Sequence, residues 1–119
     1  MTRDGVDELR QRLRAFAAER DWEQFHTPKN LAMALAGEVG ELLEIFQWLT
    51  PEQAAEVMAS DRADDVCDEL ADVTIYLVRL ADILGVDLLE VARAKLERNH
   101  DRFPPGDVHG RADVPPAGV

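Results

Sequence analysis

The chain has 119 residues, enough for one domain, and its 46% hydrophobic content argues against a disordered chain. It carries 24 acidic and 13 basic residues, a net charge of −11, which argues against a general nucleic-acid-binding surface. A nucleotide ligand is not excluded, because bound metal ions can reverse the local sign of the charge. The single cysteine, Cys67, excludes an intramolecular disulfide and a cysteine-built zinc site. With no membrane span or signal peptide in the sequence, we expect a soluble, cytoplasmic domain.

Apolar residues recur at helical spacing in the first half of the chain. They predict a helix over about 4–20, followed by an aromatic connection over 21–26. Thr27 and Pro28 form a favourable cap and first turn, so we expect a second helix from there to about Leu49. This half of the chain therefore predicts two helices joined by a short aromatic segment.

A short helix and a longer one are predicted next. Thr50 and Gln53 have the spacing of a capping box, which opens the short helix. Ser60 or Asp61 can then cap the longer helix, which is expected over about 62–84.

The remaining start and stop signals divide the rest of the chain. Gly85 is a suitable residue to end the long helix, and Asp87 caps a last helix that runs to about Arg102. Two prolines then stop that helix. We therefore expect one domain over 1–104 and a flexible tail, rich in Pro and Gly, over 105–119.

The pattern of apolar residues predicts the fold class. Few segments alternate with a period of two and none is flanked by hairpin turns, so we expect an all-α protein. The helices predicted over 28–49 and 62–84 carry more apolar surface than one short chain can easily cover. We therefore expect a helical bundle whose four-helix core is completed by oligomerisation, with Cys67 buried.

Carboxylates occur where apolar side chains are expected. Glu38 falls within the apolar arc of its helix and Glu41 at the edge of that arc. An ionised Glu in such a place is costly unless it is paired or bound to metal. Glu69 and Asp72 repeat the spacing on the next long helix, so we expect the four carboxylates to converge. Oxygen ligands without histidine favour Mg²⁺, or Mn²⁺, over iron.

Spacing alone leaves an ordinary solvated acidic face as an alternative, above all for Asp64, Asp65 and Asp68. Gly37 and Gly40 stand beside the first acidic pair. Two glycines inside a helix lower its stability, so they indicate close packing or the approach of a ligand. The pattern therefore predicts a metal site without defining its chemistry.

Several short motifs are distributed over about residues 10 to 104. They are Arg20-Asp21-Trp22-Glu23-Gln24-Phe25-His26, Pro28-Lys29-Asn30-Leu31, Gly37-Glu38-Val39-Gly40-Glu41-Leu42, Phe46-Gln47-Trp48, Asp68-Glu69-Leu70-Ala71-Asp72-Val73 and Ile75-Tyr76-Leu77. In these motifs the sequence resembles the MazG-like nucleotide pyrophosphohydrolases, most closely the members that hydrolyse dCTP. The resemblance implies an all-α protein that pairs its helices into four-helix cores, as a dimer or tetramer. It also implies Mg²⁺-dependent cleavage of a deoxynucleoside triphosphate, dCTP or a modified dCTP, to the monophosphate and pyrophosphate.

The resemblance also assigns site residues, position by position. The metal ligands are Glu38, Glu41, Glu69 and Asp72. The substrate-binding residues around the base and sugar are Trp22, His26, Trp48 and Tyr76. Those near the phosphates, one stripe of the last helix, are Lys95, Asn99 and Arg102. No nucleic-acid polymer and no membrane is implied as a partner.

Within this scheme the catalytic residues are expected to be Glu38 and Glu41, one of which positions the attacking water, because their pair should be the more buried one. Leu13 stands where vertebrate members that prefer dCTP carry a substrate-contacting histidine, so the preferred base is open. Two alternatives are a broader or dUTP-preferring pyrophosphohydrolase and a non-catalytic helical protein that binds metal or a partner helix.

Overall fold

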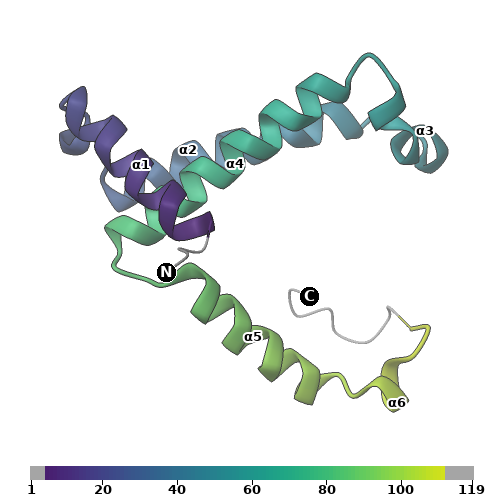
Figure 1. Cartoon of the computed structure of the whole chain (residues 1–119). Helices are drawn as coiled ribbons and strands as arrows, with labels where there is room; N and C mark the ends of the chain where they lie inside the picture. Colours follow the sequence, from purple (N-terminus) through teal and green to yellow (C-terminus); the bar gives the residue numbers. More distant parts are fainter. Residues whose placement is uncertain (1–4, 112–119) are drawn as a thin grey trace. The chain divides into compact units, whose positions relative to one another are not determined.

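The computed structural model describes residues 5–111, and every regular element in that range is a helix. These helices form two compact units, which are described separately. The first unit, which reaches Val86, contains α1 (Gly5–Glu19), η1 (Glu23–Phe25), α2 (Pro28–Phe46), α3 (Pro51–Ala55), η2 (Val57–Ala59) and α4 (Ala63–Ile83) (Figure 1). The second unit, which begins at Asp87, contains α5 (Leu88–Arg102) and α6 (Pro105–Val108). The all-α prediction is confirmed.

The first unit is built around α2 and α4, which lie side by side (Figure 1). They run antiparallel: Ile45 near the end of α2 packs with Val66 near the start of α4. At the other end His26, just before α2, is hydrogen-bonded to Arg79 near the end of α4. α1 also packs against α4. Side chains from α2 and α4 can therefore meet all along their shared face.

Most predicted caps are confirmed. The Thr27 hydroxyl accepts a hydrogen bond from the amide three residues later at 3.2 Å, and Asp87 does the same for α5 at 3.1 Å. Thr50 and Gln53 form both bonds of a capping box. Gly85 adopts a φ of +69°, a left-handed conformation that ends α4 and that glycine adopts without steric cost. These local signals fix where the helices start and stop.

Two boundaries differ from the prediction. α2 ends at Phe46, because the chain then turns, with the Leu49 amide bonded to the Phe46 carbonyl at 3.0 Å. The expected cap of α4 at Ser60 or Asp61 is wrong, since Arg62 holds that position without a side-chain cap. The Ser60 hydroxyl instead accepts from the Arg62 amide at 3.1 Å and stabilises the turn before the helix.

The buried core of the first unit is small. Ile45, Val57 and Val66 form one cluster where α2, η2 and α4 meet, and Ala17 of α1 is fully buried. The expectation that Cys67 is buried is wrong, because its side chain is exposed in this chain. Cys67 stands about 100° around the helix from Val66, which takes it off the face that meets α2.

Large apolar side chains remain exposed on both long helices. On α2 and α4 the exposed ones are Met33, Val39, Leu43, Leu70 and Leu77. Soluble monomers rarely expose contiguous apolar patches this rich in large side chains. One copy of the chain therefore leaves apolar surface on α2 and α4 uncovered, as the sequence indicated.

The second unit consists of α5 and the short α6. α6 lies within the segment that the sequence marked as a flexible tail, so residues 105–108 of that segment are helical. Residues 112–119 of the same segment lie outside the described residues. Within 5–111, none of the helices combines the length and apolar character that a membrane crossing requires.

Candidate functional site

Three carboxylates meet between α2 and α4. Glu38 and Glu41 of α2 and Glu69 of α4 each offer one oxygen atom, and these atoms lie within 4.8 Å of one another. Glu38 and Glu41 share a helix face because they are three residues apart. Glu38 and Glu69 are half-buried and Glu41 is exposed. The antiparallel pairing therefore brings together acids that are 28 residues or more apart in the sequence.

The charges of this cluster are not compensated by any described residue of the chain. Within residues 5–111 no arginine or lysine forms an ion pair with the three carboxylates. One oxygen of Glu38 (Oε2) and one of Glu69 (Oε2) are buried without a hydrogen-bond partner in the described part of the chain. Buried carboxylates are costly unless they are paired or coordinate a metal. These oxygens, which are hard ligands in a set without nitrogen or sulphur, fit a divalent cation such as Mg²⁺ or Mn²⁺.

The electrostatics agree with this interpretation. Burial, contact with Glu38 and repulsion by Glu41 raise the pKa of Glu69 to about 7. The pKa of Glu38 is also raised: the contact with Glu69 lowers it, but burial and repulsion by Glu41 and Asp72 outweigh that effect. Carboxylates gathered at this distance cannot all be ionised cheaply, so a cation would relieve the repulsion.

Asp72 is close to this cluster but not part of it. Its charge acts on Glu38, but its carboxylate is not among the three that lie within 4.8 Å of one another. The structure therefore converges three of the four expected acids. The expectation that α2 holds the more buried pair is wrong, because Glu41 is exposed whereas Glu69 and Asp72 are both half-buried.

Gly37 and Gly40 have free space on their surface. A Cβ atom added at either position would meet nothing within 4 Å. Close packing inside the chain therefore does not explain the two glycines. Of the two reasons that the sequence offered, approach by a ligand remains, together with packing against a second copy.

Three of the expected nucleoside-binding residues lie in the first unit near the N-terminal end of α2 or along α4. Trp22 is 44% exposed and packs edge-on against Phe16, with ring centroids 5.7 Å apart. Tyr76 is half-buried and stands one turn beyond Asp72 on α4. His26 is half-buried in the connection before α2. These three side chains are therefore neither buried in the core nor fully exposed.

Trp48 is separated from the other aromatic residues. It follows the C-terminal end of α2, whereas Trp22 precedes the N-terminal end, and α2 of 19 residues spans roughly 28 Å. Its side chain is 86% exposed. The structure of one chain therefore does not bring Trp48 together with Trp22.

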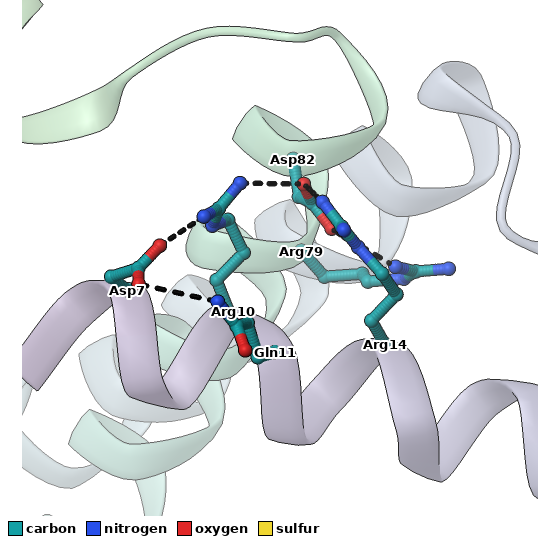
Figure 2. Close-up of polar contacts among 6 residues, drawn as sticks. All are labelled: Asp7, Arg10, Gln11, Arg14, Arg79 and Asp82. Carbon is teal, nitrogen blue, oxygen red and sulfur yellow. Dashed lines mark hydrogen bonds and ion pairs between the residues drawn. The ribbon is translucent and has the colours of Figure 1, made fainter. Parts of the chain in front are cut away.

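A network of ion pairs that the sequence did not reveal surrounds the buried carboxylate of Asp82 (Figure 2). Arg14 of α1 binds the Asp82 carboxylate through two nitrogens, at 2.6 and 3.0 Å. Arg10, which also binds Asp7, lies 3.6 Å from Asp82. Arg79 lies 3.4 Å from the same carboxylate. Arg14 lowers the pKa of Asp82, against the effect of burial. These ion pairs fix α1 on the C-terminal half of α4.

The same network reaches His26. Arg79, which is 4% exposed, donates from Nε to Nδ1 of His26 at 3.0 Å. Burial and the positive charge of Arg79 lower the pKa of His26. The sequence carried no signal for this contact, because His26 and Arg79 are 53 residues apart.

The expected phosphate-binding residues all lie on α5, in the second unit. Lys95, Asn99 and Arg102 share one helix face, and Lys95 and Arg102 are exposed. The Asn99 side-chain oxygen is buried and has no hydrogen-bond partner among the described residues. The guanidinium of Arg102 lies 5.3 Å from the ring centroid of Phe103. This face of α5 therefore combines two cations with an unsatisfied amide.

The chain is similar in sequence to a known family and to several of its relatives. Residues 34–112 match the MazG-like family. The chain is 46% identical over 100 residues to dCTP pyrophosphatase 1 of Bos taurus, covering 83% of this chain and 59% of that protein. It is 51% identical over 51 residues to a dATP/dGTP diphosphohydrolase of Cyanophage S-2L, covering 43% of this chain and 48% of that protein.

A solved structure gives a longer match. The crystal structure of a pyrophosphatase from Archaeoglobus fulgidus superposes with a TM-score of 0.81 at 40% identity, covering 87% of this chain and 96% of that one. The chain spans about three-fifths of the length of the bovine dCTP pyrophosphatase 1. The family match includes Glu38, Glu41 and Glu69, the part of α2 from residue 34 onward and the whole of α4. The chain therefore belongs to the MazG-like family.

Proposed function

We propose that this protein is a Mg²⁺-dependent nucleoside triphosphate pyrophosphohydrolase, which cleaves dCTP or a modified dCTP to the monophosphate and pyrophosphate. The observation that carries the proposal is the carboxylate cluster of Glu38, Glu41 and Glu69, with two buried oxygens that no group among the described residues satisfies. The name of the bovine relative, dCTP pyrophosphatase 1, supports the substrate class. Removing nucleotides from the cellular pool is the role that follows, in the cytoplasm as the sequence predicts.

In this reaction the acids hold the cation. Glu38, Glu41 and Glu69 supply the oxygens, and Asp72, whose charge acts on the same cluster, is proposed as a further ligand. When bound, a divalent ion would screen the negative phosphates from the acids and would supply Lewis-acid activation of phosphorus and water. We propose that Glu38 or Glu41 orients the water that attacks the α-phosphorus.

The resemblance assigns the remaining side chains of each unit to the substrate. Trp22 and Tyr76 offer aromatic faces for the base and sugar, and base stacking on such a ring contributes roughly 1 to 3 kcal/mol. A ring packed under the sugar leaves no room for a 2′-hydroxyl, which favours deoxyribose. On α5, Lys95 and Arg102 offer two cations for the pyrophosphate, and the side-chain NH₂ of Asn99 offers a hydrogen-bond donor.

We propose that the working form is a homo-oligomer, a dimer or a tetramer. The exposed apolar residues of α2 and α4, among them Leu43 at 60% and Leu70 at 50%, need a partner surface. Trp48, exposed at the far end of α2 from Trp22, can meet the same nucleotide only if it comes from another copy. Two copies that pair α2 and α4 would satisfy both requirements.

A nucleotide screen tests the activity. The protein is incubated with each of the eight common NTPs and dNTPs and Mg²⁺, and pyrophosphate and orthophosphate are measured separately. We expect pyrophosphate release, fastest with dCTP, and none after chelation of the metal. No release from any nucleotide would contradict an enzymatic function, and orthophosphate in place of pyrophosphate would contradict the cleavage position.

The same screen decides the second candidate, a pyrophosphohydrolase that prefers another base. The relative from Cyanophage S-2L is named for dATP and dGTP, and its match makes purines a concrete alternative. Leu13, which stands where vertebrate members that prefer dCTP carry a histidine, also leaves dUTP or a broader range open. A rate with dATP, dGTP or dUTP above that with dCTP would replace the assigned substrate and keep the reaction.

A further inference from the structure

We infer that Arg79 is a positioning residue, held by Asp82 and the arginines of α1, which fixes the His26 ring as a neutral hydrogen-bond donor through Nε2. The inference rests on the proposed function in that it assigns this donor to the nucleoside end of the substrate. Neither Arg79 nor Asp82 belongs to the residues that the sequence motifs marked.

The geometry of the His26 contact determines the tautomer. A guanidinium has only donors, so Nδ1 of His26, 3.0 Å from Arg79 Nε, must be the unprotonated acceptor. The neutral ring then carries its proton on Nε2, since one nitrogen is a donor when the other is an acceptor. Protonation at Nδ1 would break the bond and set two cations against each other. Arg79 therefore holds both the orientation and the charge state of the ring.

Arg79 is itself fixed from two sides. Its Nη1 lies 3.4 Å from Asp82 Oδ2, so one planar group spans Asp82 and His26. Arg14 binds both oxygens of the same Asp82 carboxylate, and Arg10 lies 3.6 Å from one of them. Figure 2 shows these side chains of α1 reaching toward Asp82 and Arg79 on α4. The far end of the network is thus anchored on another helix.

The backbone around His26 is also restrained. The Asn30 side chain donates to the Phe25 carbonyl at 3.0 Å, and the His26 amide donates to the Glu23 carbonyl at 3.1 Å. Glu23 is the acidic group that favours protonation of His26, and its effect is smaller than those of burial and Arg79. Burial and the charge of Arg79 therefore outweigh Glu23 and favour the neutral form of the ring.

The position of His26 matches a contact with the nucleoside rather than the phosphates. Glu69, Asp72, Tyr76 and Arg79 follow one face of α4 at i, i+3, i+7 and i+10. Arg79 stands about 15 Å along the helix axis from Glu69. A substrate whose phosphates lie at Glu69 would extend past Tyr76 toward His26. A neutral Nε2–H there suits an uncharged acceptor such as a carbonyl or ring nitrogen of a base.

A double-mutant cycle tests the coupling. We expect Arg79→Leu to lower kcat/KM for dCTP about tenfold, mainly through KM, but to change it less than about twofold in a His26→Ala background. Arg79→Lys, which keeps the charge and a donor, should recover part of the loss. Arg12→Leu, at an arginine of α1 that is 78% exposed, is the matched control and should have no effect. Equal losses in both backgrounds would mean that Arg79 acts only on the fold, and would overturn the inference.

A spectroscopic measurement tests the inference apart from catalysis. Nitrogen-15 NMR of the His26 ring should report the Nε2–H tautomer in the unmodified protein and a mixture with more protonated ring in Arg79→Leu. An unchanged His26 spectrum in Arg79→Leu would overturn the inference even if the protein is active. If no nucleotide is cleaved, the proposed function fails, whereas the NMR result still decides whether Arg79 sets the tautomer.

Discussion

The two halves of α4 handle buried acids in opposite ways. In the C-terminal half Asp82 is surrounded by three arginines, and its pKa is lowered, with Arg14 as the main cause. In the N-terminal half Glu69 faces two further acids and, among residues 5–111, no cation. Burial, contact with Glu38 and repulsion by Glu41 raise its pKa to about 7. Both side chains approach another helix, but only Asp82 stabilises that approach. The contrast separates an acid that serves the fold from one that serves a ligand.

The largest expected effect comes from the acid that lacks a counter-charge. Glu38→Gln keeps the shape of the side chain and removes its charge, so we expect pyrophosphate release to fall about a hundredfold to a thousandfold. The free energy of unfolding without metal should stay the same or rise, because repulsion by Glu41 and Asp72 is relieved. Enzyme assays and thermal unfolding measure the two quantities.

The matched control is Asp64→Asn, at an exposed acid in the first turn of α4. It should leave both activity and stability nearly unchanged. Mg²⁺ should raise the melting temperature of the unmodified protein and of Asp64→Asn but much less that of Glu38→Gln. Equal behaviour of the two variants would contradict a metal site at Glu38.

The second effect concerns the apolar surface, which also differs between the halves. Val78 and Ala81 in the C-terminal half are buried, whereas Leu70 in the N-terminal half is 50% exposed. We expect Leu70→Asp to weaken assembly by about a hundredfold in the dissociation constant, because a charge replaces an apolar contact. Ala81→Asp should instead lower the helix content of the chain. Light scattering and circular dichroism separate the outcomes, and a folded, active species of 13.3 kDa at low micromolar concentration would refute the oligomer.

A smaller effect is expected from removing the compensated acid. Asp82→Asn leaves the buried Arg79 without its carboxylate partner and loosens α1, at a cost of about 2 kcal/mol in the free energy of unfolding. Arg10 and Arg14 are partly exposed and can turn to water, which limits the loss. Chemical denaturation measures it. A loss as small as that of Asp64→Asn would show that the network contributes little to the fold.

The smallest effect is the pH dependence of the same network. The folded-state pKa of Asp82 lies below the ordinary value of about 3.9, so its ion pairs stabilise the fold fully above that pH. Their contribution is lost as the pH falls through the folded-state pKa. We therefore expect the difference in the free energy of unfolding between the unmodified protein and Asp82→Asn to be constant from about pH 5 to about pH 7. The difference should narrow below about pH 4. A difference that widens on acidification would contradict this sign.

The sequence by itself determined the local features of the chain. The caps at Thr27, Thr50 and Asp87 and the stop at Gly85 depend on residues at most a few positions apart, so they could be identified from spacing. The i, i+3 spacing likewise identified Glu38 with Glu41 as one acidic pair. Composition and periodicity were enough for the all-α fold class.

Only the tertiary structure decided which distant residues meet. The pairing of α2 with α4 joins Glu69 to Glu38 and Glu41 and leaves Asp72 at the margin. The Arg14–Asp82 ion pair spans 68 residues, and no local pattern distinguishes it from any other pair of opposite charges. Burial, too, depends on which helix covers which face, so the exposed Cys67 could not be predicted from its own helix. Local chemistry sets the helices, whereas packing between them sets the charge environment of each acid.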